Sequence, residues 1–377
     1  MPADSPLASR IRQRLADIDT QGLRRSLAPP AGIDLSSNDY LNLSRDPRVV
    51  AAFAAAAREE GVGSTGSRLL RGDRDLFHRV EAQVAAFKGT ERALYFSSGY
   101  MANLAVLTTL PERGDVIFSD ARNHASLIDG ARLSRAKTVV APHHDIDGLA
   151  GLLRRTPCEG TRFVVIESLY SMDGDVARLV DYAALCRAAG ATLVVDEAHA
   201  VGVYGATGSG LLEEAGVDAN QCLTINTASK ALGVSGAFVA GPEWAIEYLA
   251  QKARPFVFST AATPAVMGAI AASLAIVRQE PERRERLRTR SAYLRNQLRA
   301  AGVTVPVGIS QIIPVIVGDN ERAVELARTL QTQGFDARAI RPPSVPPGTA
   351  RLRVSVNAAL DEATLDRFVT LVAGALG

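Results

Sequence analysis

The sequence Thr192-Leu-Val-Val-Asp196-Glu-Ala-His199 is an apolar run that ends in an acidic residue and, three residues later, a histidine. Further along the chain, the run Leu223-Thr-Ile-Asn-Thr227 leads in the same way to Lys230. Short β-branched runs without alternating polarity are typical of strands buried on both faces of a parallel sheet. The two runs therefore predict strands whose carboxyl ends carry Asp196, His199 and Lys230.

Similar runs recur along the chain and alternate with helical patterns. The strand candidates are Ala93–Phe96, Val116–Ser119, Thr138–Ala141, Phe163–Glu167, Thr192–Asp196, Leu223–Asn226 and Ala237–Ala240. Helical periodicity lies between them, for example in Arg74–Phe87, Tyr100–Leu110, His124–Ser134 and Leu179–Ala188. This alternation predicts an α/β fold with a mostly parallel, seven-stranded sheet.

The pattern changes after Pro264 to long helices rich in alanine and arginine, followed by short strands near 311–317 and 351–356. A chain of 377 residues also exceeds what one hydrophobic core usually holds. We therefore predict an N-terminal segment (1–45), a large domain (46–265) and a smaller C-terminal α+β domain (266–377).

Composition argues against several classes of protein. Lys and Arg total 42 against 40 for Asp and Glu, and no basic stripe appears, so no nucleic-acid partner is expected. Three scattered cysteines argue against a disulfide framework or a zinc site, and no metal site is predicted. No apolar stretch has the length of a signal peptide or a membrane span, so we expect a cytoplasmic protein without membrane association.

Polar residues stand just after successive predicted strands. They are Ser98, Gly99, Tyr100, His124, Ser171, Asp196, His199, Thr227 and Lys230. Ligands of open α/β sheets bind outside the carboxyl ends of the strands, so these residues are expected to form one site.

The residue types at this site indicate a cofactor. A lysine that can form a Schiff base, a carboxylate that can face a pyridine nitrogen and a nearby histidine are the groups that pyridoxal 5′-phosphate requires. The junction Ser98-Gly99-Tyr100 would present backbone N–H groups to its phosphate. Taken singly, Lys230 could be a surface lysine, Asp196 a helix cap and either histidine structural. Their combination favours the cofactor.

A glycine motif elsewhere is not interpreted as a nucleotide site. Gly61-Val-Gly63-Ser-Thr-Gly66 matches the dinucleotide fingerprint as a string, but it follows the helical run Ala51–Glu60. The fingerprint requires a preceding strand, so NAD binding is not predicted.

Several motifs in order along the chain resemble the α-oxoamine synthases, a family of fold-type I pyridoxal phosphate enzymes. They are Leu35-Ser-Ser-Asn-Asp-Tyr-Leu41, the loop 63–72, Ser98-Gly99-Tyr100, Asn123-His124-Ala-Ser126, Ser171-Met-Asp-Gly-Asp175, Asp196-Glu-Ala-His199 and Thr227-Ala-Ser-Lys230. The resemblance implies condensation of an amino acid with an acyl thioester, carried by coenzyme A or a carrier protein, and loss of CO₂. The tail 339–353 resembles the branch that joins L-alanine to a pimeloyl thioester.

The resemblance also implies residue roles and an obligate homodimer. Lys230, His124, Asp196 and His199 are the implied catalytic residues. Ser98, Gly99, Tyr100, Ser171 and Thr227 join them in binding the cofactor, with Ser259 and Thr260 reaching the phosphate from the neighbouring subunit. The implied substrate-binding residues are Arg24, Asn38, Ser67, Arg341, Ser344 and Arg353.

The chain departs from the family pattern at a few positions. Asn42 stands where glycine is frequent, Ser229 precedes the lysine where many relatives of the alanine branch have glycine, and Arg68 and Arg71 make their loop more basic. The alternatives are glycine with acetyl-CoA or succinyl-CoA, or serine with a long acyl-CoA. A non-catalytic partner subunit is disfavoured because Lys230 is present, and an aminotransferase because of the tail 339–353.

Overall fold

The computed structural model describes residues 5–377, which form two compact units. The large unit comprises 38–171 and 175–288. The small unit comprises the described residues up to Ser37, together with 172–174 and 289–377. The breaks at 37/38 and 288/289 differ from the predicted 45/46 and 265/266, because the helices that follow residues 45 and 265 pack on each other within the large unit.

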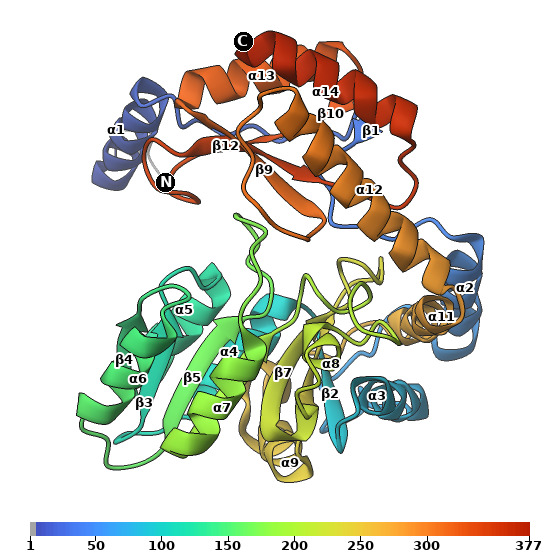
Figure 1. Ribbon diagram of the computed structural model, residues 1–377. Coiled ribbons are helices and arrows are strands. Elements are labelled where there is room, and N and C mark those ends of the chain that lie inside the picture. The colour runs from blue at the N-terminus through green and yellow to red at the C-terminus, as the bar shows by residue number, and fades with distance from the viewer. Residues whose placement is uncertain (1–4) are drawn as a thin grey trace. The chain divides into compact units, whose positions relative to one another are not determined.

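The large unit is built on a seven-stranded sheet with the order β2-β8-β7-β6-β5-β3-β4 (Figure 1). Its strands are β2 (Arg92–Phe96), β3 (Val116–Asp120), β4 (Lys137–Ala141), β5 (Arg162–Glu167), β6 (Ala191–Asp196), β7 (Cys222–Thr227) and β8 (Ala237–Gly241). The adjacent strands β4, β3, β5, β6 and β7 are parallel to one another. The strand β8 runs antiparallel to both of its neighbours, β7 and β2. All seven predicted strands and the mostly parallel sheet are confirmed.

Helices cover both faces of this sheet (Figure 1). On one face lie α4 (Gly99–Thr109), α5 (Ala125–Leu133), α9 (Glu243–Lys252) and α10 (Arg254–Val257). They bury alternate strand residues such as Phe163, Val194 and Ile225. On the other face lie α6 (Ile146–Arg155) and α7 (Leu179–Ala189). Burial on both faces explains why the strands are apolar throughout.

Three further helices pack beside the sheet: α2 (Pro47–Glu60), α3 (Asp75–Lys88) and α11 (Ala265–Gln279). A Cβ on Gly268 of α11 would lie 2.8 Å from both the Ala52 carbonyl oxygen and the Ala56 Cβ of α2. The approach of α2 and α11 is therefore possible only because these residues are small. The short elements α8 (Leu211–Glu214) and η1 (Ala219–Gln221) lead into β7.

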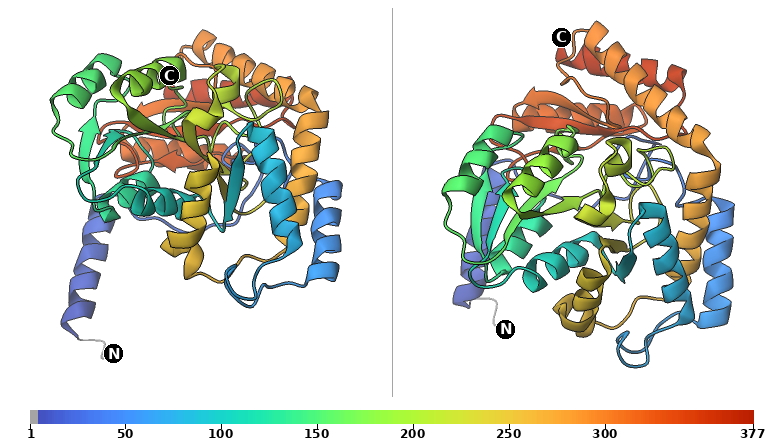
Figure 2. Two further views of the ribbon diagram at one scale, coloured as in Figure 1. Left: turned by 90° about the horizontal axis from the view of Figure 1, so that it is seen from below. Right: turned by 60° about the horizontal axis from the view of Figure 1, so that its bottom comes forward.

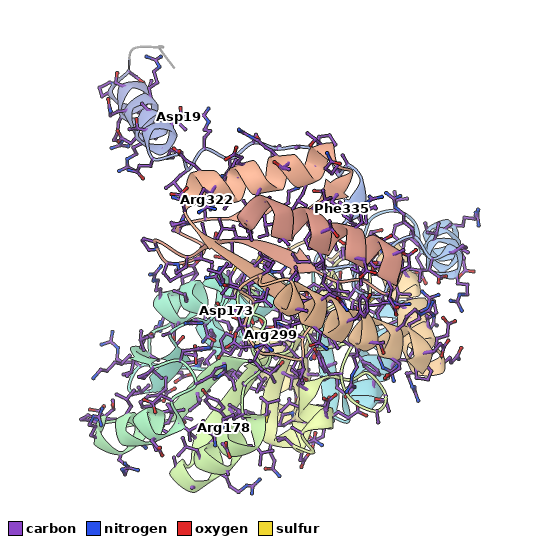
Figure 3. The ribbon with its side chains drawn as sticks, turned by 45° about the horizontal axis from the view of Figure 1, so that its top comes forward. Asp19, Asp173, Arg178, Arg299, Arg322 and Phe335 are labelled. Carbon is purple, nitrogen blue, oxygen red and sulfur yellow. The ribbon has the colours of Figure 1, made fainter. Side chains whose placement is uncertain are left out.

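The long helix α12 (Pro281–Ala300) begins in the large unit and continues into the small one. The small unit then forms an antiparallel sheet of β11 (Ala339–Ile340), β12 (Ala350–Ser355) and β9 (Ile312–Gly318). Its helices are α13 (Asn320–Thr332) and α14 (Glu362–Leu376). Phe335 packs on Phe368 of α14 with ring centroids 5.5 Å apart, and Figure 3 shows Phe335 beside that helix.

The N-terminal part of the chain adds elements to the small unit that the sequence did not predict. The strand β1 (Ile33–Asp34) pairs in parallel with β10 (Phe335–Asp336). The helix α1 (Pro6–Thr20) has no buried residue and is the blue helix near the N-terminus in Figure 2. Its Leu7, Ile11, Leu15 and Ile18 are each 37–43% exposed. Among residues 5–377, no helix is both long and apolar enough to cross a membrane.

Candidate active site

The carboxyl ends of five strands meet at one edge of the large-unit sheet. β3, β5, β6 and β7 are mutually parallel. β2 has the same direction because it is antiparallel to β8, which is itself antiparallel to β7. The residues after these strands therefore converge there, as the sequence predicts.

Asp196, the last residue of β6, is only 6% exposed and is held at both carboxylate oxygens. Its Oδ2 accepts a hydrogen bond from Asn103 Nδ2 at 2.8 Å, and its Oδ1 accepts one from the Ala198 amide at 2.9 Å. The Asp196 side chain is thus fixed in position by two donors, which suits a group that must face a ring nitrogen.

Asn103 was not predicted as a site residue. It lies on α4, is 1% exposed, and also donates to Ser126 Oγ at 2.8 Å. A buried amide inside the apolar sequence Met101-Ala-Asn-Leu-Ala-Val106 was the signal that could have revealed it. Its partner is distant in sequence, so the pairing is visible only in the fold.

His124 stands at the N-terminus of α5, where its ring lies against Ser126. Its Nδ1 is 2.7 Å from Ser126 Oγ, and its backbone amide donates to Glu167 Oε1 at 2.6 Å. Partial desolvation of the imidazole lowers the pKa of His124, with Asp196 opposing and Lys230 reinforcing the shift. A neutral, fixed imidazole is suited to stacking on an aromatic ring.

Glu167 is a second residue that the sequence analysis did not single out. It ends β5, is 4% exposed and lies directly opposite Asp196. Burial raises the pKa of Glu167 well above its usual range, the Asp196 charge adds to the effect, and Lys230 opposes it. The site therefore holds two buried carboxyl groups side by side, and burial favours the neutral form of Glu167.

His199 follows the turn after β6 and is 4% exposed. Its Nδ1 lies 2.7 Å from the hydroxyl of Tyr40, which also donates to Asn38 Oδ1 at 3.0 Å. The ring nitrogen Nδ1 is thereby engaged, which fixes the orientation of the imidazole. Predicted residues Asn38 and His199 are thus joined through Tyr40.

The predicted phosphate-binding segment lies at the start of α4. Ser98 caps the helix by accepting the Met101 amide at 3.2 Å. The amides of Gly99 and Tyr100 belong to the first turn, where a helix cannot satisfy its own donors. A Cβ on Gly99 would lie 3.1 Å from Thr227 Oγ1 at the end of β7. These donors line a space that a larger residue would fill, which fits a phosphate group.

Lys230 lies in the bend after β7 and is partly buried. Its positive charge acts on both His124 and Glu167. This places the amine at the same strand edge as Asp196, in agreement with the sequence. The donor set of amine, carboxylate, imidazole and helix N-terminus fits pyridoxal 5′-phosphate.

Three other predicted cofactor residues lie in loops of the large unit. Ser171 is partly buried and follows the isolated bridge residue Leu169. Ser259 and Thr260 follow α10, where the next amide, Ala261, donates to the Gly66 carbonyl at 2.9 Å. Ser67, in the same loop as Gly66, accepts the Leu70 and Gly72 amides at its carbonyl.

The remaining predicted substrate residues belong to the small unit. Arg341 donates to the backbone carbonyls of Gly22 and Arg24, and Ser344 Oγ accepts from Arg25 at 3.3 Å. Arg24 pairs with Asp19 at 3.3 Å. These residues line a cavity of about 900 Å³ within the small unit. Arg353, on β12, donates to Ser355 Oγ at 2.8 Å.

Arg68, which the sequence places in a basic loop, is not available to bind a ligand. Its guanidinium donates to both carboxylate oxygens of Glu81, at 2.9 and 3.1 Å, and also contacts Asp73. Its side chain is 8% exposed. The charge of Arg68 is used to hold α3, so only Arg71 keeps this loop basic.

The departure at Asn42 has a structural explanation. Its φ is +54°, in the left-handed region that glycine and asparagine tolerate best. Ser229 places its hydroxyl 3.3 Å from Thr227 Oγ1, beside the predicted phosphate-binding segment. Neither departure disturbs the residues around Asp196.

Comparison with known proteins agrees with this site. The model of the aminotransferase class I and II family matches residues 30–372. A relative named 8-amino-7-oxononanoate synthase from Anaeromyxobacter dehalogenans is 46% identical over 97% of this chain and 95% of its own. The relative of the same name from Burkholderia pseudomallei is 46% identical over 94% of both chains.

Solved structures give the same result. Serine palmitoyltransferase from Sphingomonas wittichii superposes with a TM-score of 0.91 at 34% identity, covering 100% of this chain and 98% of that one. An 8-amino-7-oxononanoate synthase from Francisella tularensis gives 0.79 at 28% identity, covering 91% and 97%. The chain belongs to the aminotransferase class I and II family of fold-type I pyridoxal phosphate enzymes. Within it, the chain is an α-oxoamine synthase, as the motifs around Lys230 indicate.

Proposed function

We propose that the protein condenses L-alanine with a pimeloyl thioester, releasing CO₂ and the free thiol carrier and forming 8-amino-7-oxononanoate, a step of biotin synthesis. The observation that carries this assignment is the 46% identity, over nearly the whole chain, to relatives that bear this name. In the reaction, the Cα–H, Cα–carboxylate and C–S bonds break. A bond forms between the alanine Cα and the acyl carbon, Cα takes up a proton after CO₂ leaves, and the thiolate sulfur takes up a proton as the carrier is released.

Pyridoxal 5′-phosphate supplies the electron-accepting ring that makes loss of the Cα proton feasible. Asp196 keeps the ring nitrogen protonated, since its carboxylate is fixed by Asn103 and the Ala198 amide. His124 covers one face of the ring. The amides of Gly99 and Tyr100 and the hydroxyl of Thr227 bind the phosphate.

Lys230 has two roles in this proposal. Its Nζ would hold the cofactor covalently in the resting enzyme and would afterwards accept the proton from the alanine Cα. His199, oriented by Tyr40, and Ser171 would hydrogen-bond the ring hydroxyl. The positive charge of Lys230 acts on Glu167 and on His124, so proton movement at Lys230 would alter the field around both.

The resemblance to the α-oxoamine synthases is the basis for proposing which residues bind the substrates. Arg353 and Arg341 are the candidates for binding the alanine carboxylate, because a guanidinium presents two parallel donors. Arg24, Ser344, Asn38 and Ser67 are the other substrate-binding candidates that the resemblance implies. The distal carboxylate of a pimeloyl group needs a cation, and Arg24 and Arg71 are the candidates once Arg68 is excluded.

A homodimer completes the proposal, with Ser259 and Thr260 contributing to the phosphate site of the partner. The exposed apolar stripe on α1, formed by Leu7, Ile11, Leu15 and Ile18, supports association with a second copy. The amino acid and acyl thioester are the expected partners, the carrier being coenzyme A or a carrier protein. We place the protein in the cytoplasm.

A second candidate is the serine and long acyl-CoA reaction, favoured by the TM-score of 0.91 to serine palmitoyltransferase. The lower identity of 34%, against 46% for the 8-amino-7-oxononanoate synthases, argues for the alanine branch. Glycine with acetyl-CoA or succinyl-CoA remains the other variant of the same chemistry.

The test is a matrix of kcat/KM values with alanine, glycine and serine against acetyl, succinyl, pimeloyl and palmitoyl thioesters. Specificity is a difference in transition-state binding, so kcat/KM is the proper measure. Alanine with the pimeloyl donor is expected to give the highest value. A higher value for any other pair would exclude the assignment to biotin synthesis while leaving the family chemistry intact.

Two further experiments test the attachment of the cofactor to Lys230 and the sharing of the phosphate site between two subunits. Borohydride reduction followed by peptide mapping should place the pyridoxyl group on Lys230 alone. Mixing and refolding a Lys230→Ala variant with a variant altered at Ser259 and Thr260 should restore about a quarter of the wild-type activity through mixed dimers. No restoration, or an active monomer in sedimentation, would contradict the shared site.

A further inference from the structure

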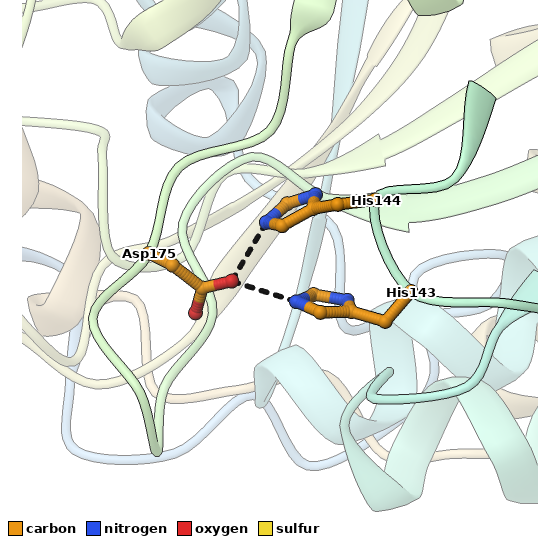
Figure 4. A group of neighbouring side chains, drawn as sticks. All are labelled: His143, His144 and Asp175. Carbon is orange, nitrogen blue, oxygen red and sulfur yellow. Dashed lines mark hydrogen bonds and ion pairs between the residues drawn. The ribbon is translucent and has the colours of Figure 1, made fainter. Parts of the chain in front are cut away.

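A group of three side chains in the large unit, His143, His144 and Asp175, points its polar atoms toward one place (Figure 4). The two histidines follow β4, and Asp175 lies in the segment after β5. The Nε2 atoms of His143 and His144 lie 2.7 and 2.6 Å from Asp175 Oδ2. None of the three has a role in the chemistry proposed above.

We propose that His143, His144 and Asp175 bind one divalent transition-metal ion through the two Nε2 atoms and the Asp175 carboxylate. Two imidazoles and one carboxylate form a common ligand set for zinc and other first-row metals, with further positions left for water. The scattered cysteines gave no indication of this site, because its ligands are histidine and aspartate residues on separate loops.

The geometry requires little movement to accept an ion. The three ligand atoms lie within 4.8 Å of one another. A tetrahedral ion with bonds of about 2.0–2.1 Å holds its ligand atoms about 3.3–3.4 Å apart. Each Nε2 atom, now 2.7 or 2.6 Å from Asp175 Oδ2, therefore needs to move away from it by about 0.6–0.8 Å as the ion replaces the bridging protons.

A second carboxylate orients His143 from behind. Asp120, at the end of β3 and 3% exposed, lies with its Oδ1 2.8 Å from His143 Nδ1. This contact keeps a proton on Nδ1, so that once the Nε2 proton is displaced the Nε2 lone pair is directed at the cluster. A carboxylate behind a histidine in this way is the usual support for a metal ligand.

The rings are also fixed by Tyr170 and by the backbone. The Tyr170 ring meets His143 and His144 edge-on, with centroid distances of 4.5 and 5.3 Å. His144 has a φ of +56°, a conformation that costs a residue other than glycine on the order of 1 kcal/mol. Such a cost is tolerated where the surrounding structure needs that side chain in that position.

The consequence of metal binding would be structural. The ion would connect the loop after β4 to the segment 169–176. The ends of this segment pair through the Leu169–Val176 bridge, and Ser171 lies between them. Three ligands from two segments restrict the segment around Ser171 more than hydrogen bonds alone. The proposed ion thus acts on the position of Ser171 and takes no part in bond making.

The test is zinc binding to the full-length holoenzyme, measured by calorimetry and by metal analysis after equilibrium dialysis. One zinc ion per chain with a micromolar or lower Kd is expected. His144→Asn and Asp175→Asn should each weaken binding by at least about 100-fold. His144→Asn is the decisive variant, because asparagine tolerates the left-handed conformation and the fold should persist.

His78→Asn serves as the matched control. His78 Nε2 also lies 2.6 Å from an aspartate oxygen, that of Asp73, but no second histidine shares that carboxylate. This variant, and Cys158→Ser, should bind zinc as the wild type does. The proposal is overturned if the wild type takes up no stoichiometric zinc at micromolar concentration. It is equally overturned if His144→Asn retains wild-type affinity.

Discussion

Glu167 and Asp196 lie directly opposite each other at the carboxyl ends of the adjacent parallel strands β5 and β6. Both side chains are buried, at 4% and 6% exposure. Two neighbouring carboxyl groups with little access to water are not both ionised at low cost. Asp196 accepts two hydrogen bonds, whereas burial and the Asp196 charge raise the pKa of Glu167.

This relationship predicts that Glu167→Gln changes how stability depends on pH. The pKa of Glu167 is raised in the folded state from an unfolded value of 4.5. Above about pH 4.5 the unfolded chain releases this proton and the folded chain keeps it, so the wild type loses stability as pH rises toward the folded pKa. Glutamine is neutral throughout, so the variant should gain stability relative to the wild type.

Urea unfolding of both proteins at several values from about pH 5 to about pH 8 measures this difference. The advantage of the variant should increase with pH. Parallel curves for the two proteins would show that Glu167 does not retain its proton in the folded state.

Asn103→Ala is predicted to slow the reaction. The substitution removes the donor to Asp196 Oδ2 and the bond to Ser126. A hydrogen bond to a charged group contributes about 1.5–3 kcal/mol, so kcat/KM should fall by about 10- to 100-fold. Thr108→Ala is the matched control on the same helix, because its hydroxyl bonds only to the Leu104 carbonyl. Equal activities of the two variants would contradict the role of Asn103.

The strands of the large sheet could be predicted because each is a continuous apolar run that needs no partner to be recognised. The residues after these strands follow from the same reasoning. In contrast, β1 and β10 are two residues long and carry no periodicity, so neither was predicted. Arg68 was misinterpreted because its partner Glu81 lies on the next helix, α3, where sequence alone does not reveal the pair.

Lys88→Met is predicted to destabilise the large unit strongly. Lys88 Nζ lies 2.5 Å from Glu197 Oε2, and both side chains are at most 1% exposed. Removing the lysine leaves a buried carboxylate without its cation, which costs about 3–5 kcal/mol. The urea midpoint should fall accordingly, without a change in the slope.

The double variant Lys88→Met with Glu197→Gln provides the control for that experiment. Glutamine can still accept the Leu212 amide, which lies 3.0 Å from Glu197 Oε1. Since no buried charge remains, the double variant should be more stable than Lys88→Met alone. A double variant that is less stable would indicate that packing, and not the unpaired charge, causes the loss.

Asp196→Asn is predicted to slow removal of the alanine Cα proton more than it weakens cofactor binding. The substitution keeps the shape and the hydrogen bond to the Ala198 amide but removes the charge opposite the ring nitrogen. The Asp196 charge stabilises the transition state most, because negative charge develops on the substrate there. Removing that charge should therefore raise the activation free energy more than it weakens cofactor binding. Exchange of the alanine α-proton, followed by NMR in deuterated water, should slow by at least about 100-fold.

Asp115→Asn is the matched control, because Asp115 is also a buried carboxylate beside a strand of the same sheet. It precedes β3, at the opposite edge of the sheet, and accepts the Thr161 amide at 2.6 Å. This control should lower stability and leave the exchange rate of the bound enzyme unchanged. Near-normal exchange in Asp196→Asn would show that Asp196 fixes the position of the cofactor without setting its reactivity.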